Sequence, residues 1–429
     1  MVEAPPRGPP PQPQPRKLAR VLGTGIITGA ADDDPSAIGT YASAGARFGF
    51  GFLWIAPVLL PMMYVVVYLS AKLGRVYGKG LFAAIRDRYP VWLLYPLMLL
   101  AFTGNIIEAA ANLGGMGAAL NLLLPIPIAG LVVGVALAVV LLQLFGSYEL
   151  IRRVFRWLAL ALFAYVAAAI LARPDWSAVL GATFTPQVHW GGDFLMMVVA
   201  CIGTSLSAYI YTWESNQEVE EQIAEGRRRW WQRIGASRRE LARTRRDVVL
   251  GMIFSNLILY FIILATGATL HPAGRTEIDS AAAAAAALEP LAGTGAKLLF
   301  ALGVIGVGFL AVPVMTTGAA YDLVQGLGGS ASLHQHLNEA RLFYGLIVIV
   351  TALAVALNFL GFNPMRALVW SGIVQGFSVP PLLLVMMLMT NDRILMRERT
   401  NGWFTNLLGW ITTAATFVAT ACFLASWSQ

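Results

Sequence analysis

Three adjacent carboxylates, Asp32, Asp33 and Asp34, are followed directly by Pro35 near the start of the chain. Proline has no backbone N–H and leaves a carbonyl upstream without its usual donor. Inside a bilayer, such irregular backbone is tolerated only where it lines a protein cavity, and acids at that depth usually belong to an ion pathway. An acidic loop outside the membrane is the alternative, because residues 18–31 would rise only about 21 Å as a helix. The flanks "LGTGIITGAA" and "AIGTYASAGARFGF" are each about half a bilayer long, which favours a helix that unwinds at the midplane.

A second polar interruption occurs in "MMVVACIGTSLSAYIYTWESNQEVEE", where Thr204, Ser205 and Ser207 separate two apolar halves. Hydroxyl side chains that bond back to their own helix would be an ordinary explanation. The position of this segment, five apolar runs after the first interruption, favours a second broken helix. In secondary transporters, discontinuous helices come in pairs, one in each inverted repeat.

The elements that must position these residues are membrane helices. The chain of 429 residues is 57% hydrophobic and 12% charged, with a mean hydropathy of +0.67, whereas about a quarter of a soluble protein is charged. We therefore predict an all-α polytopic membrane protein with a LeuT-type five-plus-five inverted repeat, discontinuous first and sixth helices and one additional helix. The eleven predicted spans are 18–48 (the broken one), 53–74, 92–122, 126–145, 156–172, 194–216, 247–269, 296–322, 341–361, 364–390 and 403–427.

The spans divide the chain into four parts. Residues 1–17 are expected to form a disordered, proline-rich cytoplasmic arm, because they have no apolar core and are not a signal peptide. The first repeat is predicted at 18–172 and the second at 194–390, which includes a cytoplasmic linker at 217–246. The eleventh span, 403–427, follows the two repeats.

The distribution of basic residues predicts the orientation. They fall in alternate gaps between the spans, which is the positive-inside pattern, so we expect a protein of the plasma membrane with its N-terminus in the cytoplasm and its C-terminus outside. A net charge of +7 is explained in this way without nucleic acid as a partner. The residues that carry this prediction are Arg16, Lys17, Arg20, Arg75, Lys79, Arg86, Arg88, Arg152, Arg153, Arg156, Arg393, Arg397 and Arg399.

The linker "EVEEQIAEGRRRWWQRIGASRRELARTRRD" is the most highly charged segment. A nucleic-acid surface with Trp230 and Trp231 stacked on bases is one interpretation. A cytoplasmic helix lying on the anionic leaflet is the interpretation we favour. The acids at the cytoplasmic end of the sixth span are expected either to line an exit or to form an ordinary solvated helix end: Glu214, Glu218, Glu220 and Glu221.

The two broken segments together resemble the Nramp superfamily of divalent-metal transporters. The stretches "DDDPSAIGTYASAGARFGFGFLW" and "GTSLSAYIYTWESNQEVEE" carry the resemblance, which extends from about residue 18 to the tenth span. It is closest to the Nramp-related branch associated with Mg²⁺. In the common branch the first helix breaks at Asp-Pro-Gly-Asn and the sixth at Met-Pro-His. Asp, Asn and Met side chains and two backbone carbonyls hold a largely dehydrated ion there.

At the first break, the resemblance places Asp34 on the family's aspartate and Ala31 on the carbonyl donor one turn earlier. Ala37 stands where the asparagine should be, so that side-chain ligand is missing. The additional acids Asp32 and Asp33 have two open roles. They would either add negative charge at the site or its outer vestibule, or one of them would cap the second half-helix.

At the second break, Ser207 stands where the family has methionine, Thr204 offers the second carbonyl and Tyr209 replaces the histidine. A thioether is a soft ligand, whereas Mg²⁺ prefers oxygen and retains several waters. The resemblance therefore implies a roomier, oxygen-only site for Mg²⁺, with Mn²⁺ also accepted. Gln375, on the tenth span, is expected to face the ion, with a helix–helix hydrogen bond as the alternative.

Proton coupling in the common branch uses carboxylates on the third span and the histidine of the sixth. Asn112 stands where a coupling acid is expected, and Glu108 lies one turn earlier. We therefore predict a monomeric Mg²⁺ uniporter without a cofactor, in which Glu108 either relays protons or pairs with a polar neighbour.

Three alternative functions remain. The first is a proton-coupled Mn²⁺/Fe²⁺ symporter. The second is a sodium-coupled amino-acid symporter, although the acids would repel the carboxylate of its substrate, and the third is an intramembrane hydrolase that uses Asp34 and Glu108. We do not expect an enzyme.

Overall fold

The structure, a computed structural model, describes residues 24–145, 162–329, 331–335 and 337–427, and all regular elements in these ranges are helical. The predicted arm at 1–17 and the basic residues Arg152, Arg153 and Arg156 lie outside them. The helices of the first half are α1 (Thr24–Asp32), α2 (Pro35–Phe48), α3 (Ile55–Tyr77), α4 (Leu81–Arg88), α5 (Val91–Asn121), α6 (Ile128–Phe145), α8 (Phe163–Leu171) and α9 (Trp176–Phe184).

The second half begins with another broken pair, α10 and α11, and ends with α20. Its helices are α10 (Gly192–Ser205), α11 (Ala208–Ala224), α12 (Trp230–Arg233), α13 (Arg238–Thr269), α14 (Ala281–Ala285), α15 (Glu289–Ala292), α16 (Ala296–Gly326), α17 (Arg341–Asn358), α18 (Pro364–Asn391), α19 (Arg393–Met396) and α20 (Trp403–Trp427).

Nine helical segments within the described ranges are long and apolar enough to cross a membrane. They coincide with the predicted spans two to four and six to eleven. The first predicted span is not among the nine: its described part consists of helices of 9 and 14 residues, and 18–23, with Arg20, lie outside the described residues. The fifth span is represented by α8, with 9 residues, since 156–161 lie outside the described residues.

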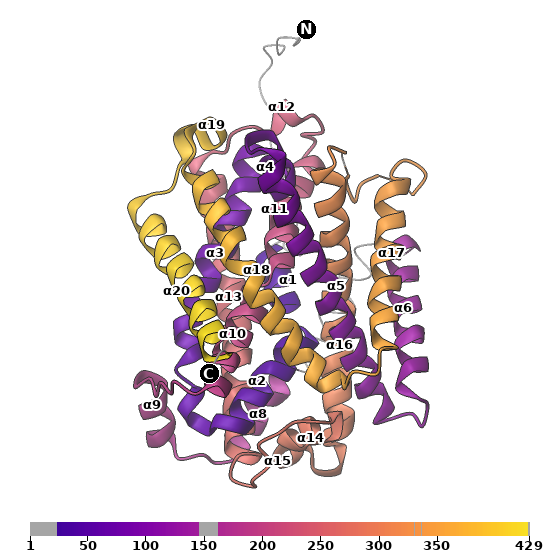
Figure 1. The fold of residues 1–429 in the computed structure, drawn as a ribbon, viewed down its shortest axis with the longest axis vertical. Coiled ribbons are helices and arrows are strands. Elements are labelled where there is room, and N and C mark those ends of the chain that lie inside the picture. The colour runs from indigo at the N-terminus through magenta and orange to yellow at the C-terminus, as the bar shows by residue number, and fades with distance from the viewer. Residues whose placement is uncertain (1–23, 146–161, 330, 336, 428–429) are drawn as a thin grey trace.

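The long helices run side by side, and the short helices gather at the two ends of the bundle (Figure 1). At one end lie α4, α12 and α19, with the basic residues of segments 75–88 and 393–399; we call this the basic end. At the other end lie α9, α14 and α15, the last two formed by the alanine-rich segment. The grouping of basic segments at one end agrees with the predicted alternation of the spans.

The predicted single linker helix at 217–246 is wrong. Helix α11 continues to Ala224, α12 is one turn long, and α13 already begins at Arg238. Gly226 and Gly235, with φ angles of 91° and 87°, interrupt the helix because this left-handed backbone suits glycine. The linker is bound to the end of α3, where the Trp230 indole donates to the Tyr77 carbonyl at 2.9 Å.

The crossing of α10 and α18 allows no side chain at Gly203. A Cβ atom at this position would lie 1.8 Å from the Gly372 carbonyl oxygen. We expect Gly203→Ala to destabilise the protein by about 1–3 kcal/mol, because overpacking forces the two helices apart. Thermal unfolding of the purified protein measures the effect. Gly134→Ala on α6 is the matched control, since nothing lies within 4 Å of its Cβ position; equal melting temperatures for both variants would contradict the prediction.

Candidate metal site

The two interrupted helices meet in the interior of the bundle. Between α1 and α2, Asp34 has extended backbone (φ −66°, ψ 171°), and between α10 and α11, Ser207 has φ −58° and ψ 143°. Both breaks lie where the sequence predicts them. They touch through the hydroxyl groups of Ser36 and Thr204, whose oxygens are 3.1 Å apart.

Asp34 caps α2 and points into this junction. Its Oδ1 accepts hydrogen bonds from the Ala37 backbone N–H at 2.6 Å and from the Ser36 hydroxyl at 2.8 Å. Its Oδ2 accepts from the Asn112 side-chain amide at 2.9 Å. Asn112 in turn accepts from the Ser36 backbone N–H at 2.8 Å, so α5 orients the beginning of α2. Ala37 contributes its N–H here, and its methyl group offers no ligand to an ion.

Glu108, one turn before Asn112 on α5, faces the same junction. Its Oε1 accepts from the Ser207 hydroxyl at 2.9 Å and from the Ser36 hydroxyl at 3.3 Å. Its Oε2 accepts from the Gln375 amide at 2.6 Å. Gln375 also accepts from the Ala208 N–H at 3.3 Å and thereby joins α18 to α11. The two expectations for Gln375, a place beside the site and a helix–helix hydrogen bond, are therefore compatible.

The junction brings together two carboxylates that have no basic partner among the described residues. Asp34 and Glu108 are 1% and 0% exposed, and no hydrogen bond or ion pair joins either of them to Lys, Arg or His within the part of the chain that the structure describes. The Ser36 hydroxyl lies near both carboxylates, but its single hydrogen can be donated to only one of them at a time. Because unpaired buried charge is very unfavourable, this arrangement is suited to a bound cation, and two carboxylates match the charge of one dication.

The two carbonyls expected to bind the ion also lie at the junction. The Thr204 carbonyl is 3.1 Å from the Ser207 hydroxyl, which also reaches the Gly203 carbonyl at 2.8 Å. The Ala31 carbonyl accepts from the Tyr209 hydroxyl at 3.0 Å. Tyr209 thus holds the end of α1 against α11. Of these oxygens, the Ser207 hydroxyl contacts the Glu108 carboxylate directly and the Thr204 carbonyl lies next to that hydroxyl.

Asp32 and Asp33 belong to a different contact. Both carboxylates lie beside the Ser255 hydroxyl of α13, at 2.8 Å and 2.9 Å, and both are 0% exposed. The suggestion that one of them caps the second half-helix is wrong, because Asp34 is the capping residue. Their complete burial is also inconsistent with a position in an outer vestibule.

Two residues of this junction were not selected from the sequence. Ser36 lies in the first break, where a hydroxyl directly after Pro35 is well placed to face the junction. Met315, on α16, has its sulfur 3.2 Å from the Asn112 amide nitrogen. No local pattern distinguishes Met315 from other methionines of apolar spans.

Residues 25–426 match the family described as "Nramp: Natural resistance-associated macrophage protein-like". The chain belongs to the Nramp family. Curated relatives include a "Divalent metal cation transporter MntH" of Deinococcus radiodurans, 29% identical over 403 residues, covering 92% of this chain and 87% of the relative. The corresponding MntH of Mycobacterium tuberculosis (strain CDC 1551 / Oshkosh) is also 29% identical, with 91% and 88% covered.

Solved structures place this Nramp protein in the predicted fold. A manganese transporter of Eremococcus coleocola superposes with a TM-score of 0.71 at 18% identity, covering 96% of this chain and 88% of that one. Mhp1, a nucleobase-cation-symport-1 family transporter, superposes with a TM-score of 0.61 at 11% identity, with 95% and 92% covered. The predictions of a multi-pass LeuT-type transporter and of a non-enzymatic protein are confirmed by these likenesses and by the family.

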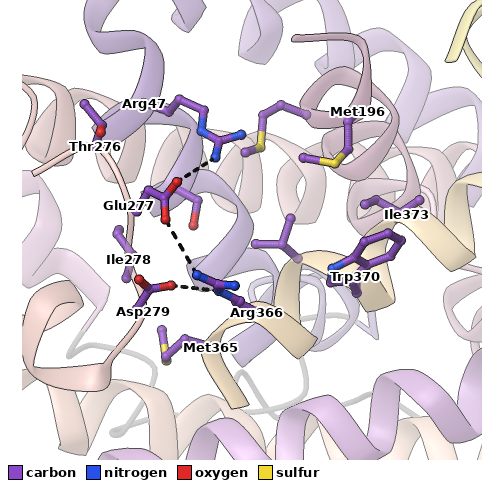
Figure 2. Close-up of a pocket in the computed structure, with 13 residues that line it drawn as sticks. Arg47, Met196, Thr276, Glu277, Ile278, Asp279, Met365, Arg366, Trp370 and Ile373 are labelled. Carbon is purple, nitrogen blue, oxygen red and sulfur yellow. Dashed lines mark hydrogen bonds and ion pairs between the residues drawn. The ribbon is translucent and has the colours of Figure 1, made fainter. Parts of the chain in front are cut away.

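At the end opposite the basic end, this Nramp protein has a pocket of about 240 Å³. Figure 2 shows Glu277 between two arginines, 3.5 Å from Arg47 of α2 and 3.7 Å from Arg366 of α18; Arg366 also binds Asp279 at 2.8 Å. These charged groups are solvent-accessible, with the Glu277 side chain 58% exposed. None of the residues that line the pocket belongs to the Asp34–Glu108 junction.

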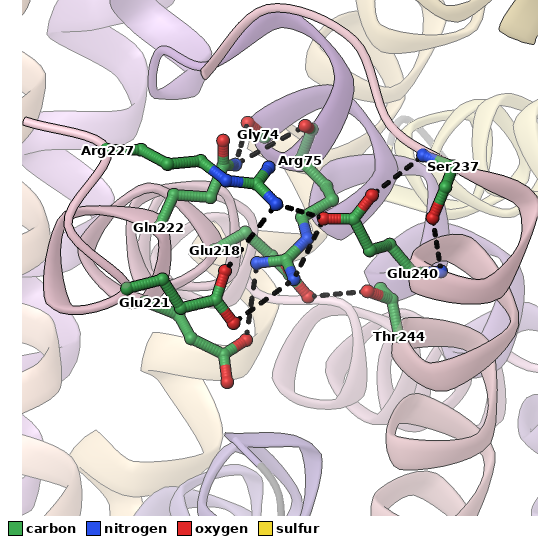
Figure 3. A network of polar contacts seen from close by, with 10 residues as sticks. Gly74, Arg75, Glu218, Glu221, Gln222, Arg227, Ser237, Glu240 and Thr244 are labelled. Carbon is green, nitrogen blue, oxygen red and sulfur yellow. Dashed lines mark hydrogen bonds and ion pairs between the residues drawn. The ribbon is translucent and has the colours of Figure 1, made fainter. Parts of the chain in front are cut away.

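At the basic end, Glu214, Glu218 and Glu220 of α11 are only 1%, 2% and 7% exposed and the Glu221 side chain 21%, which contradicts the expectation of a solvated helix end. Arg75 of α3, with its side chain 2% exposed, lies 3.5 Å from Glu218 and 3.4 Å from Glu221 (Figure 3). Glu225 and Glu240 approach the same guanidinium at 3.7 Å and 3.8 Å. The arginine thereby joins α3, α11 and α13. The site itself is buried, since Asp34 and Glu108 are 1% and 0% exposed.

Proposed function

We propose that this Nramp protein carries Mg²⁺, and Mn²⁺ with it, across the plasma membrane into the cell. The observation that carries the proposal is the pair Asp34 and Glu108, buried together without a basic partner among the described residues. The names of the curated relatives support a divalent metal cation as the substrate class. The proposal adds the preference for Mg²⁺ and the direction of movement.

The ligands we propose are the two carboxylates, the Ser207 hydroxyl and the carbonyls of Ala31 and Thr204. All are oxygen donors, which suit a hard ion. The methyl group of Ala37 leaves room for retained water, and Mg²⁺ loses its water reluctantly. In this arrangement the amides of Asn112 and Gln375 and the hydroxyl of Tyr209 hold the ligands in place. Such supporting hydrogen bonds orient the ligands and tune the affinity.

We further propose uniport by alternating access between the repeats 18–172 and 194–390, with the N-terminus in the cytoplasm, the C-terminus outside and a single chain as the working unit. Asn112 and Tyr209 replace groups that take protons in the common branch. The membrane potential alone supplies about 4.6 kcal/mol per 100 mV for an entering dication. One observation favours a proton-coupled Mn²⁺ symporter as second candidate: Glu108 shares the Ser36 hydroxyl with Asp34 and could exchange a proton with it.

Proteoliposomes with an internal Mg²⁺ dye and an internal pH dye test the proposal. We expect saturable Mg²⁺ entry that depends on an inside-negative potential, without acidification, and with no entry for Asp34→Ala. Mn²⁺ entry accompanied by protons, with no Mg²⁺ entry, would support the second candidate instead. No entry of either ion in protein that unfolds cooperatively would refute the proposed function.

A further inference from the structure

We propose that the Met315 thioether of α16 is the residue that admits softer dications, such as Mn²⁺ and Cd²⁺, to the site beside Mg²⁺. This inference rests on the proposed function, because it concerns the selectivity of the same site. The proposal assigns a ligand to α16, a helix that contains neither of the two breaks. It also departs from the oxygen-only site that the replacement of methionine by Ser207 implies.

A single amide group separates the sulfur from the site's carboxylate. The Asn112 side-chain nitrogen is 3.2 Å from the Met315 sulfur and 2.9 Å from Asp34 Oδ2. An amide NH₂ has two hydrogens, so one points to the carboxylate and the other to the sulfur. Met315 is 0% exposed. The thioether therefore lies against the polar junction, where it has no access to bulk solvent.

The contact with Asn112 is weak enough to be exchanged. A thioether is a poor hydrogen-bond acceptor, and its unbranched side chain, with three rotatable bonds, adapts easily. Exchange of this contact would free the sulfur for an ion bound to Asp34, while Asn112 keeps its hydrogen bond to Oδ2. Sulfur contributes little to binding a hard ion but adds affinity for a softer one. The choice among dications would thus depend on α16, while Asp34 and Glu108 supply the charge.

A purely packing role for Met315 makes a different prediction. A methionine that only fills space can be replaced by leucine, of similar volume, at small cost and without any change in selectivity. The test is therefore Met315→Leu, with Met116→Leu as the matched control. Met116 is also 0% exposed, but a Cβ atom at Gly308 would meet its sulfur at 2.4 Å, so it packs against α16 away from the carboxylates.

The experiment compares Cd²⁺ and Mg²⁺ affinities of the purified protein by calorimetry, and Cd²⁺ inhibition of Mg²⁺ uptake in proteoliposomes. We expect the ratio of Cd²⁺ to Mg²⁺ affinity to fall about tenfold in Met315→Leu, at the lower end of the effects seen around metal sites, and to stay unchanged in Met116→Leu. X-ray absorption of bound Cd²⁺ should show a sulfur neighbour that disappears in Met315→Leu. An unchanged ratio, or no sulfur neighbour in the unaltered protein, would overturn the inference.

Failure of the proposed function gives a different result. If the unaltered protein moves no divalent ion but still binds Cd²⁺ through sulfur, transport is refuted while the role of Met315 stands. If it transports Mg²⁺ with a selectivity that Met315→Leu leaves unchanged, the role of Met315 is refuted while transport stands.

Discussion

Asp34→Asn is expected to reduce Mg²⁺ uptake by at least about 100-fold, the upper end of what changes beside a metal ligand cause, without unfolding the protein. The variant removes one of the two negative charges that face the ion and keeps the shape of the side chain. Asparagine is also a good helix cap, so the hydrogen bond from the Ala37 N–H to the side chain can persist. Uptake into proteoliposomes and Mg²⁺ binding by calorimetry measure the effect.

Two further variants separate charge from structure in this experiment. Asp34→Ala loses both the charge and the cap of α2, and we expect about 1 kcal/mol of additional destabilisation from the lost cap. Ser255→Ala alters only the contact of Asp32 and Asp33 with α13 and should leave Mg²⁺ affinity much closer to that of the unaltered protein. Near-normal uptake by Asp34→Asn would show that the carboxylate charge at this break is not what binds the ion.

Arg75→Met is expected to lower the free energy of unfolding by about 3–5 kcal/mol, because removing one partner of a buried ion pair leaves uncompensated charge. Four carboxylates surround this guanidinium within 4 Å, and the Glu218 side chain is only 3% exposed. Methionine keeps the aliphatic length of the side chain. Denaturant unfolding of the purified protein in detergent gives the free energy.

A second arginine of the same ion-pair network serves as the control. Arg227 pairs with Glu240 at 2.6 Å, but its side chain is 28% exposed, so Arg227→Met should cost only about 0–1 kcal/mol. The double variant Arg75→Met/Glu218→Gln should recover part of the loss, since it removes one of the stranded charges. Equal destabilisation by the two single variants would contradict the assignment of Arg75 as the centre of this network.

Both helix breaks could be predicted from the sequence because their signals are local. Acids next to a proline, and hydroxyls between apolar halves, are incompatible with continuous helix in a bilayer, whatever surrounds them. Of the three acids, Asp34 is the one that faces the junction, which is the residue that the resemblance placed on the family's aspartate. The family match agrees with the resemblance carried by these same segments.

The partners across the junction could be predicted only in part. Glu108 was recognised as an acid within a span, but its contact with Ser36 depends on how α5 packs against two broken helices. Asp32 and Asp33 have the same chemical character as Asp34, and only the position of Ser255, more than two hundred residues later, separates their roles. Side-chain partners that come from distant helices leave no periodic pattern in the chain.

The linker and the acids of α11 show a second limit of sequence reasoning. Charged residues near a helix end usually face water, and that general expectation failed for Glu218 because Arg75 arrives from α3. In the linker, the charge density suggested one helix, whereas glycines at 226 and 235 divide it. A left-handed glycine and an ordinary loop glycine cannot be told apart without the packing around them.

The two groups of ion pairs, Glu277 with its arginines and Arg75 with its carboxylates, differ in exposure and should respond differently to salt. Mobile ions screen charges over about 10 Å at 0.1 M ionic strength, and they act on solvated pairs far more than on buried ones. Glu277 and its two arginines are solvated, whereas Arg75 is not. Raising the ionic strength should therefore weaken the ion pairs at the pocket and leave those of Arg75 nearly unchanged. The rate of thiol labelling of Ser43→Cys, at the pocket wall, would then rise with salt. The salt concentration would thus affect the contact between α2 and α18 but not the contact of α3 with α11 and α13.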